Sequence, residues 1–255
     1  MQYSILNSSL KNRVRSLVKG FANVIVPNTC LICDAYVAQP GGCCATCWSK
    51  LSFVKAPMCP VMGIPFQFDM GDKILSAEAI ANPPPFERLR TVFLYDDEIR
   101  RLVSLIKYSD RTDLVPWIAN WMMVAGGALL DDANYIVPVP LHVSRLRKRR
   151  FNQSAELARC IGKSRNLAYA PELLIRRKAT RQQVGLTENQ RERNVSGAFS
   201  VPEASKPVLS GKRILLVDDV YTTGATVKAA TRALLRAGAS NIDVLVLAKV
   251  ETDPL

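Results

Sequence analysis

The clearest chemical pattern in the sequence is a pair of adjacent acidic residues at the end of an apolar run. Residues 214–226 read ILLVDDVYTTGAT, so Asp218 and Asp219 follow four aliphatic residues and precede small hydroxylated residues around Gly224. Two neighbouring carboxylates repel each other, and a chain that holds them together usually has a cationic or hydroxyl-rich ligand to place between them. The pair therefore indicates a ligand site.

The residues after the acidic pair suit a phosphate group. Small side chains allow successive backbone N–H groups to turn toward an anion, and hydroxyls and the positive end of a following helix add donors. Carboxylates beside a phosphate are explained if the ligand also carries sugar hydroxyls, which donate hydrogen bonds to them. The pattern predicts a ribose 5-phosphate site, with a solvated charged turn as the alternative. Its candidate residues are Asp218, Asp219, Tyr221, Thr222, Thr223, Gly224, Ala225 and Thr226.

Four cysteines near the N-terminus have the spacing of a metal site. Six of the seven cysteines lie in the first quarter of the sequence, where Cys30–Cys33 and Cys44–Cys47 form two C-x2-C pairs ten residues apart. Four thiolates in two such pairs suit one tetrahedral, structural zinc ion. Disulfides are the alternative, and Cys43 could replace Cys44 as a ligand at a worse spacing to Cys47.

The composition indicates a globular protein with polyanionic partners. Hydrophobic residues make up 48% of the 255 positions, and 34 Lys and Arg against 22 Asp and Glu give a formal charge of +12. A single histidine, His142, excludes histidine-rich metal sites and most Ser-His-Asp arrangements. Residues 1–27 lack the apolar core and cleavage site of a secretory signal, so we expect a cytoplasmic protein.

The elements around the acidic pair form the most readable part of the chain. A strand at 213–217, a loop at 218–224, a helix over about 225–236 and a strand at 242–250 predict a right-handed parallel unit. In open parallel sheets, ligands lie beyond the carboxyl ends of the strands, where the acidic pair falls. Upstream, the pattern predicts strands at 91–95 and 135–139 and helices at 96–108, about 112–130 and from Asn152, whose amide can cap the last of them.

The apolar run at 114–130 is slightly short for a spanning helix and is interrupted by Pro116 and two glycines, so we expect a core helix and no integral membrane contact. Residues 172–200 are polar and basic, and we expect a long mobile excursion with a capping box from Thr187 to Gln190. Residues 1–27 carry apolar residues at helical spacing and predict a basic amphipathic helix, which is a surface arm, a membrane-surface contact or a helix packed on the protein itself.

The stretch from Ile214 to Thr226 resembles the 13-residue phosphoribosyl pyrophosphate (PRPP) signature of type I phosphoribosyltransferases. By that resemblance Asp218 and Asp219 hold the ribose 2′ and 3′ hydroxyls, and residues 222–226 hold the 5-phosphate. Thr222 stands where purine-salvage members of the superfamily have an aspartate that acts on the base. The acceptor is therefore not expected to be recognised in the hypoxanthine or guanine manner, and no catalytic residue is assigned.

PRPP also carries a pyrophosphate, which requires magnesium and basic donors when it departs. The basic run 145–150 and the loop 177–194 are the candidate segments, with an ordinary solvated basic face as the alternative for the first. The candidate residues are Lys107, Arg149, Arg150, Asn152, Gln153, Thr180, Gln183 and Arg191.

Roughly residues 28 to 250 resemble the ComF family, also called GntX-like. The resemblance rests on the cysteine pairs and the PRPP signature together with VPVPL at 137–141, RRFNQS at 149–154 and the spacing of Thr180, Gln183 and Leu186. It implies a type I phosphoribosyltransferase-like, doubly wound, mostly parallel α/β sheet with a small N-terminal zinc-binding module of four cysteines. The expected domains are an arm at 1–27, a cysteine-rich zinc module and linker at 28–85, and a phosphoribosyltransferase-like domain at 86–255.

The sequence departs from the family at a second set of cysteine positions. CPVMG at 59–63 has Met62 where the family's element has cysteine, and a further pair would fall near Ser76 and Ala79. We therefore expect one zinc ion and leave Cys59 as a lone thiol.

The resemblance implies a role in natural competence, the handling of DNA imported into the bacterial cytoplasm. The leading hypothesis is a PRPP-binding, phosphoribosyltransferase-like protein needed for transformation, with an unknown acceptor. The alternatives are a PRPP-sensing regulator without transfer activity and an adaptor that binds single-stranded DNA or a helicase, with competence and recombination proteins as partners.

Overall fold

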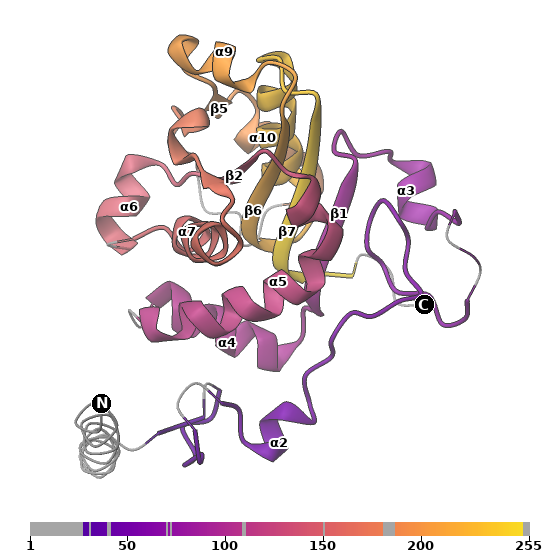
Figure 1. Ribbon diagram of the computed structural model, residues 1–255, viewed down its shortest axis with the longest axis vertical. Helices are drawn as coiled ribbons and strands as arrows, with labels where there is room; N and C mark the ends of the chain where they lie inside the picture. Colours follow the sequence, from indigo (N-terminus) through magenta and orange to yellow (C-terminus); the bar gives the residue numbers. More distant parts are fainter. Residues whose placement is uncertain are drawn as a thin grey trace, which may run out of the picture. The chain divides into compact units, whose positions relative to one another are not determined.

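The computed structural model describes residues 28–30, 32–39, 42–69, 71, 73–108, 111–149, 151–180 and 187–251 (Figure 1). The chain divides into two compact units, Met1–Lys50 and Leu51–Leu255. The predicted arm at 1–27 lies outside the described residues. The division falls after Lys50, so residues 51–85 pack with the larger unit.

The larger unit is built on a five-stranded sheet. The strands are β1 (Arg88–Leu94), β2 (Tyr135–Pro138), β3 (Ala168–Tyr169), β6 (Arg213–Tyr221) and β7 (Asn241–Lys249), in the order β1-β7-β6-β2-β3. Every pair of neighbours is parallel. This confirms the predicted parallel α/β sheet, with the acidic pair on a central strand.

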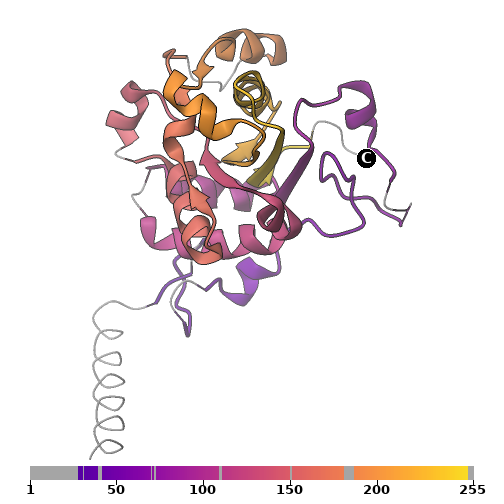
Figure 2. The ribbon, with the colours of Figure 1, turned by 45° about the horizontal axis from the view of Figure 1, so that its top comes forward.

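Helices cover both faces of the sheet. On one side α5 (Val115–Asp132) packs against β1, β7 and α7 (Gln153–Arg165), and α7 packs against β2 and β6. On the other side α10 (Ala225–Arg236) connects β6 to β7 and packs on both (Figures 1 and 2). The remaining elements are α2 (Ala45–Trp48), α3 (Ala77–Ala81), α4 (Asp97–Tyr108), α6 (Val143–Arg149), α8 (Glu188–Val195), α9 (Lys206–Leu209), β4 (Ile175–Arg176), β5 (Phe199–Ser200) and the 3-10 turns η1 (Thr112–Leu114), η2 (Pro171–Leu173) and η3 (Glu203–Ser205).

Two strands are longer than the sequence pattern predicts. β1 begins at Arg88 because its guanidinium pairs with the buried carboxylate of Asp243 on β7 at 2.7 Å, a contact that a hydrophobic pattern does not register. β6 continues to Tyr221 because its pairing with β7 runs on through Asp218 and Val220. The acidic pair is therefore part of the strand and not of the loop.

α5 is confirmed as a core helix on one face. Ile118, Met122 and Leu129 are buried, while Trp117 and Val124 are exposed. Among the described residues one helix, Thr112–Asp132, is long and apolar enough to cross a membrane by length and composition alone, and 44% of its most apolar window is buried inside the protein.

Residues 51–64 cover the free edge of β1. The backbone N–H groups of Val54 and Leu89 donate to the carbonyls of Val92 and Val61 at 2.9 and 2.7 Å. Gly63 has φ +59, and a Cβ there would lie 2.6 Å from the Leu89 carbonyl oxygen, so only glycine fits this close approach. The segment therefore satisfies an edge strand that would otherwise pair with other chains.

The segment predicted as a long excursion carries structure of its own. β4 and β5 form an antiparallel pair, and α8 begins with the predicted capping box, in which Thr187 Oγ1 accepts from the Gln190 N–H and Gln190 Oε1 accepts from the Thr187 N–H. Residues 181–186 lie outside the described part. The capping box is therefore confirmed, whereas the prediction of a mobile excursion was wrong for β4 and β5, because strands only two residues long leave no visible period in the sequence.

Candidate functional site

The carboxylates of the acidic pair are each held by a partner from a different helix. Asp218 Oδ1 accepts hydrogen bonds from Ser154 Oγ in α7 and from the Asp219 N–H, both at 2.9 Å. Asp219 Oδ2 lies 2.9 Å from Lys107 Nζ in α4. One cation and one hydroxyl thus occupy the acidic pair in the ligand-free protein, which are the two kinds of group that the sequence indicates.

The electrostatics of the pair are unusual. Burial, together with the neighbouring charge of Asp219, raises the pKa of Asp218 to about 7, although the hydrogen bonds to Asp218 and the charge of Lys107 act in the opposite direction. Burial alone would lower the pKa of Lys107, but the charges of Asp219 and Asp218 raise it above its ordinary value. The site therefore keeps a protonated lysine beside a carboxyl group that titrates near neutrality.

This arrangement predicts a pH-dependent effect of Asp218→Asn on stability. The raised pKa means that folding favours the protonated carboxyl, so the contribution of Asp218 to stability falls as pH rises from about 4 to about 7. Asparagine keeps the acceptor oxygen and removes the charge. We expect the difference in the free energy of unfolding between the variant and the wild type to be more favourable to the variant at pH 8 than at pH 4, by about 1–2 kcal/mol. The full pKa shift would give ~4 kcal/mol, but the site is partly solvated, which reduces the effect. Urea unfolding at both pH values measures this, and an equal difference at both would contradict it.

The turn after β6 is shaped for close approach of a ligand. Gly224 has φ +74 and precedes the first residue of α10, and a Cβ there would lie 2.2 Å from the Tyr221 hydroxyl oxygen. In the described part of the chain Thr223 Oγ1 is buried without a hydrogen-bond partner. The first N–H groups of a helix have no partner within it. A donor set for an anion thus lies directly beyond the acidic pair.

Two arginines share Thr180 as a hydrogen-bond partner, and the charge of Asp218 acts on one of them, Arg176. Arg176 on β4 is 8% exposed, stacks on the Phe199 ring at 5.1 Å and donates from Nη2 to Thr180 Oγ1, and Arg145 Nη2 donates to the Thr180 carbonyl at 3.0 Å. Among the described residues the Arg176 Nε has no hydrogen-bond partner. Burial, together with the charge of Arg145, lowers the pKa of Arg176 to about 10, although the charge of Asp218 acts in the opposite direction.

Arg176 was missed by the sequence analysis. It is followed by the exposed Arg177 in a run of cations, and nothing in the sequence distinguishes the buried arginine from its neighbour. The burial of Arg176 depends on the β4–β5 pairing, which is itself invisible in the sequence.

The other predicted pyrophosphate residues have mixed positions. The charge of Arg149 acts on Lys107, whose pKa it lowers. Thr180 accepts hydrogen bonds from Arg145 and Arg176. Gln153 is buried and donates from Nε2 to the Ile106 carbonyl at 3.5 Å, so it joins α7 to α4. Arg191 lies in α8. Arg150 and Gln183 lie outside the described residues.

The predicted cap of α7 by the Asn152 amide is wrong. Asn152 is the N-cap residue, but its Nδ2 donates to the Val139 carbonyl at 3.0 Å and its side chain makes no capping bond in the described structure. The amide thereby ties the start of α7 to the chain that leaves β2.

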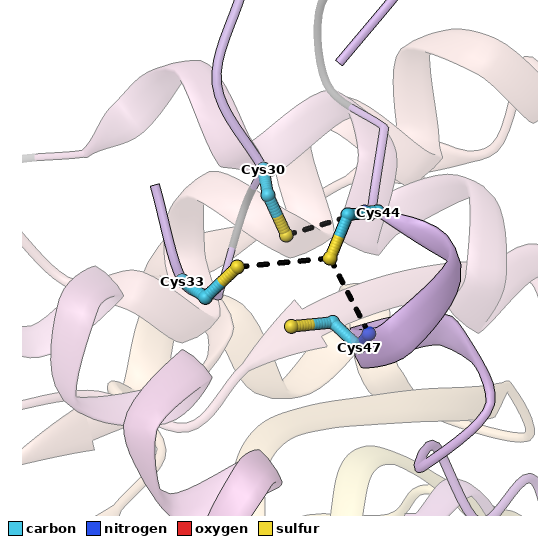
Figure 3. A group of neighbouring side chains, drawn as sticks. All are labelled: Cys30, Cys33, Cys44 and Cys47. Carbon is cyan, nitrogen blue, oxygen red and sulfur yellow. Dashed lines mark hydrogen bonds between the residues drawn. The ribbon is translucent and has the colours of Figure 1, made fainter. Parts of the chain in front are cut away.

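The smaller unit brings four cysteine sulfurs together. The Sγ atoms of Cys30, Cys33, Cys44 and Cys47 all lie within 4.8 Å of one another (Figure 3). Sulfurs bound to one zinc ion at about 2.3 Å lie about 3.8 Å apart, and Cys33 and Cys44 are 3.6 Å apart, too far for a disulfide. The N–H groups of Cys44 and Cys47 donate to Cys30 Sγ and Cys44 Sγ. This donor set fits a structural zinc ion, and Cys43 is not part of it.

At the second set of cysteine positions, residues 59, 62, 76 and 79, Cys59 is the one cysteine. Cys59 Sγ accepts from the N–H groups of Met62 and Ser76 at 3.4 and 3.3 Å, and the Ser76 Oγ accepts from the Ala79 N–H at 3.4 Å. Cys59, Met62 and Ala79 belong to the hydrophobic core. Within the described residues the only cluster of metal-ligating side chains found is the first one.

Two parts of the sequence match known domain families. Residues 21–79 match a double zinc ribbon domain, and residues 132–254 match a phosphoribosyl transferase domain. DNA utilization protein YhgH of Escherichia coli K12 is 30% identical over 232 residues, which cover 88% of this chain and 98% of that protein. Competence protein ComFC of Bacillus subtilis is 26% identical over 82% of this chain and 89% of that protein, and competence protein F of Haemophilus influenzae is 25% identical over 86% and 96%.

Proposed function

Because this chain belongs to the ComF family, also called GntX-like, which its similarity to YhgH and ComFC establishes, we propose that it binds PRPP at the carboxyl end of β6 and serves natural transformation in the cytoplasm. The observation that carries the proposal is the juxtaposition at one edge of the sheet. The acidic pair and the Gly224 turn meet there, and the charge of Asp218 acts on the buried Arg176.

Each part of PRPP has a group of matching chemistry in this site. The 5-phosphate would accept hydrogen bonds from Thr223 Oγ1 and from the first N–H groups of α10. The ribose hydroxyls would donate to Asp218 and Asp219 in place of Ser154 and Lys107. Magnesium prefers carboxylate and phosphate oxygens, and the acidic pair supplies the former; bound with PRPP it would neutralise the pyrophosphate.

Arg145 and Arg176 suit the pyrophosphate end of the ligand. Two guanidinium groups share the two oxygens of Thr180, and the burial of Arg176 strengthens its attraction for an anion. With Lys107 displaced from Asp219, a third cation becomes available at the same place. Departure of pyrophosphate leaves positive charge at the anomeric carbon, which the adjacent carboxylates of the acidic pair would stabilise.

The role in transformation rests on the relatives. ComFC and competence protein F are competence proteins by name, YhgH is a DNA utilization protein, and the formal charge of +12 suits work beside nucleic acid. Transfer to an acceptor is a separate step from binding. Release of pyrophosphate from PRPP in the presence of candidate acceptors tests for it directly.

A matched pair of variants tests the pyrophosphate assignment. Arg176→Met is expected to weaken PRPP binding about 30-fold, which corresponds to about 2 kcal/mol for a lost charged hydrogen bond, and to leave ribose 5-phosphate binding unchanged. Arg177→Met removes an exposed cation next to it and should change neither affinity. Calorimetric titration gives both constants. Equal weakening of the two ligands, or equal effects of the two variants, would contradict the assignment.

A further inference from the structure

A lysine is buried at the carboxyl end of β7, next to the end of β6. Lys249 is 1% exposed, and its Nζ lies 3.0 Å from Glu78 Oε2 in α3. A buried ammonium group is strongly unfavourable unless a counter-charge accompanies it. The carboxylate of Glu78, itself 22% exposed, therefore holds Lys249 in place.

Lys249 in turn contacts the ring of Tyr221. This ring packs against Gly224 in the turn between β6 and α10, residues 222–224, which is called the phosphate turn below. The Lys249 Nζ lies 5.6 Å from the centroid of the Tyr221 ring, within range of a cation–π interaction. Phe86 meets the same ring edge-on, with centroids 6.2 Å apart. The backbone is joined as well, because the Val250 N–H donates to the Tyr221 carbonyl at 2.8 Å. The ring is 1% exposed and has a fixed position.

Tyr221 fixes the position of Gly224. The space that a Cβ on Gly224 would need is already filled by the Tyr221 hydroxyl and ring carbons, at 2.2 to 2.7 Å. The turn therefore lies directly on the ring. A shift of the ring would move the backbone that leads into α10, where the 5-phosphate is proposed to bind.

The other end of this chain of contacts is the second ribbon, defined here as residues 57–82. α3 carries Glu78, and the start of α3 is fixed by the Ser76 cap and by the hydrogen bond from the Ser76 N–H to Cys59 Sγ. The contacts thus run from Cys59 through Glu78, Lys249 and Tyr221 to Gly224.

We propose that the second ribbon positions the phosphate turn, and that Glu78 and Lys249 are the positioning residues through which it acts. This inference rests on the proposed function, because it concerns the affinity of the same turn for a phosphorylated sugar. The proposal assigns a positioning role to the second ribbon, in which Met62, Ser76 and Ala79 stand at the positions of metal ligands.

The test measures the affinity for ribose 5-phosphate by calorimetry at a temperature well below unfolding. Glu78→Gln and Lys249→Met are each expected to weaken binding about tenfold, a coupling of ordinary size between two sites. The double variant should bind no more weakly than the worse single variant, because both substitutions break one contact.

The matched control is Glu87→Gln. Glu87 also precedes β1 and pairs with Arg213 Nη1 at 3.1 Å, but at the opposite end of β6. It should lower the melting temperature without changing the affinity, which separates positioning from general loss of stability. Unchanged affinity in both Glu78→Gln and Lys249→Met, or equal weakening by Glu87→Gln, would overturn the inference alone. Absence of ribose 5-phosphate binding in the wild type would overturn the proposed function and this inference together.

Discussion

Asp218→Asn combined with Asp219→Asn is expected to abolish binding of both ribose 5-phosphate and PRPP. Each carboxylate is proposed to accept a hydrogen bond from a ribose hydroxyl, and a hydrogen bond to a charged group contributes about 1.5–3 kcal/mol. Loss of two such bonds lowers the affinity by about 10²-fold or more. Calorimetric titration of the double variant measures this, with circular dichroism to verify that the sheet is retained.

The chain contains a matched control for this experiment. Asp131 and Asp132 are also adjacent aspartates, but they end α5 and pair with Arg165 and Arg88 at the surface. Their replacement by asparagine removes the same charge from the protein and should leave the affinity unchanged. Retained affinity in the Asp218→Asn/Asp219→Asn variant would contradict the site assignment. Equal loss of affinity in both double variants would also contradict it, because the loss would then follow from the change in net charge.

The second large effect concerns the metal. We expect about one zinc ion per chain, lost in Cys47→Ser and retained in Cys43→Ser, whose side chain lies next to the cluster without joining it. Structural zinc contributes about 10–16 kcal/mol to the folding of small zinc-binding peptides, so its removal should unfold the region around the four cysteines. Metal analysis and limited proteolysis measure the two effects.

The larger unit should remain folded after the zinc is removed, because its core includes no zinc ligand. Two zinc ions per chain would show that the second ribbon binds metal in spite of Met62. Freshly purified, reduced protein without zinc would contradict the assignment of the first cluster.

The sequence predicts the strand, turn and helix around the acidic pair because those features are local. An aliphatic run, two aspartates and a glycine-containing turn that leads into a helix follow one another within 13 positions. The four cysteines are legible for the same reason. The residues at the second set of cysteine positions, Met62, Ser76 and Ala79, are local features as well.

The partners of the acidic pair were beyond the sequence pattern because they come from distant elements. Ser154 meets Asp218 across 64 positions, and nothing near Ser154 indicates that its hydroxyl faces the end of β6. Lys107 was predicted as a pyrophosphate contact, but its ion pair with Asp219 was not foreseen. In the sequence, Lys249 is a cation at the end of an apolar strand. Its burial depends on the carboxylate of Glu78, which lies 171 positions away in the sequence.

The measurement that tests the central claim most directly is calorimetric titration of the wild-type protein with PRPP in the presence of magnesium. We expect saturable binding to one site per chain, with ribose 5-phosphate binding the same site more weakly because it lacks the pyrophosphate. Absence of binding under these conditions would contradict the claim that the carboxyl end of β6 is a PRPP site.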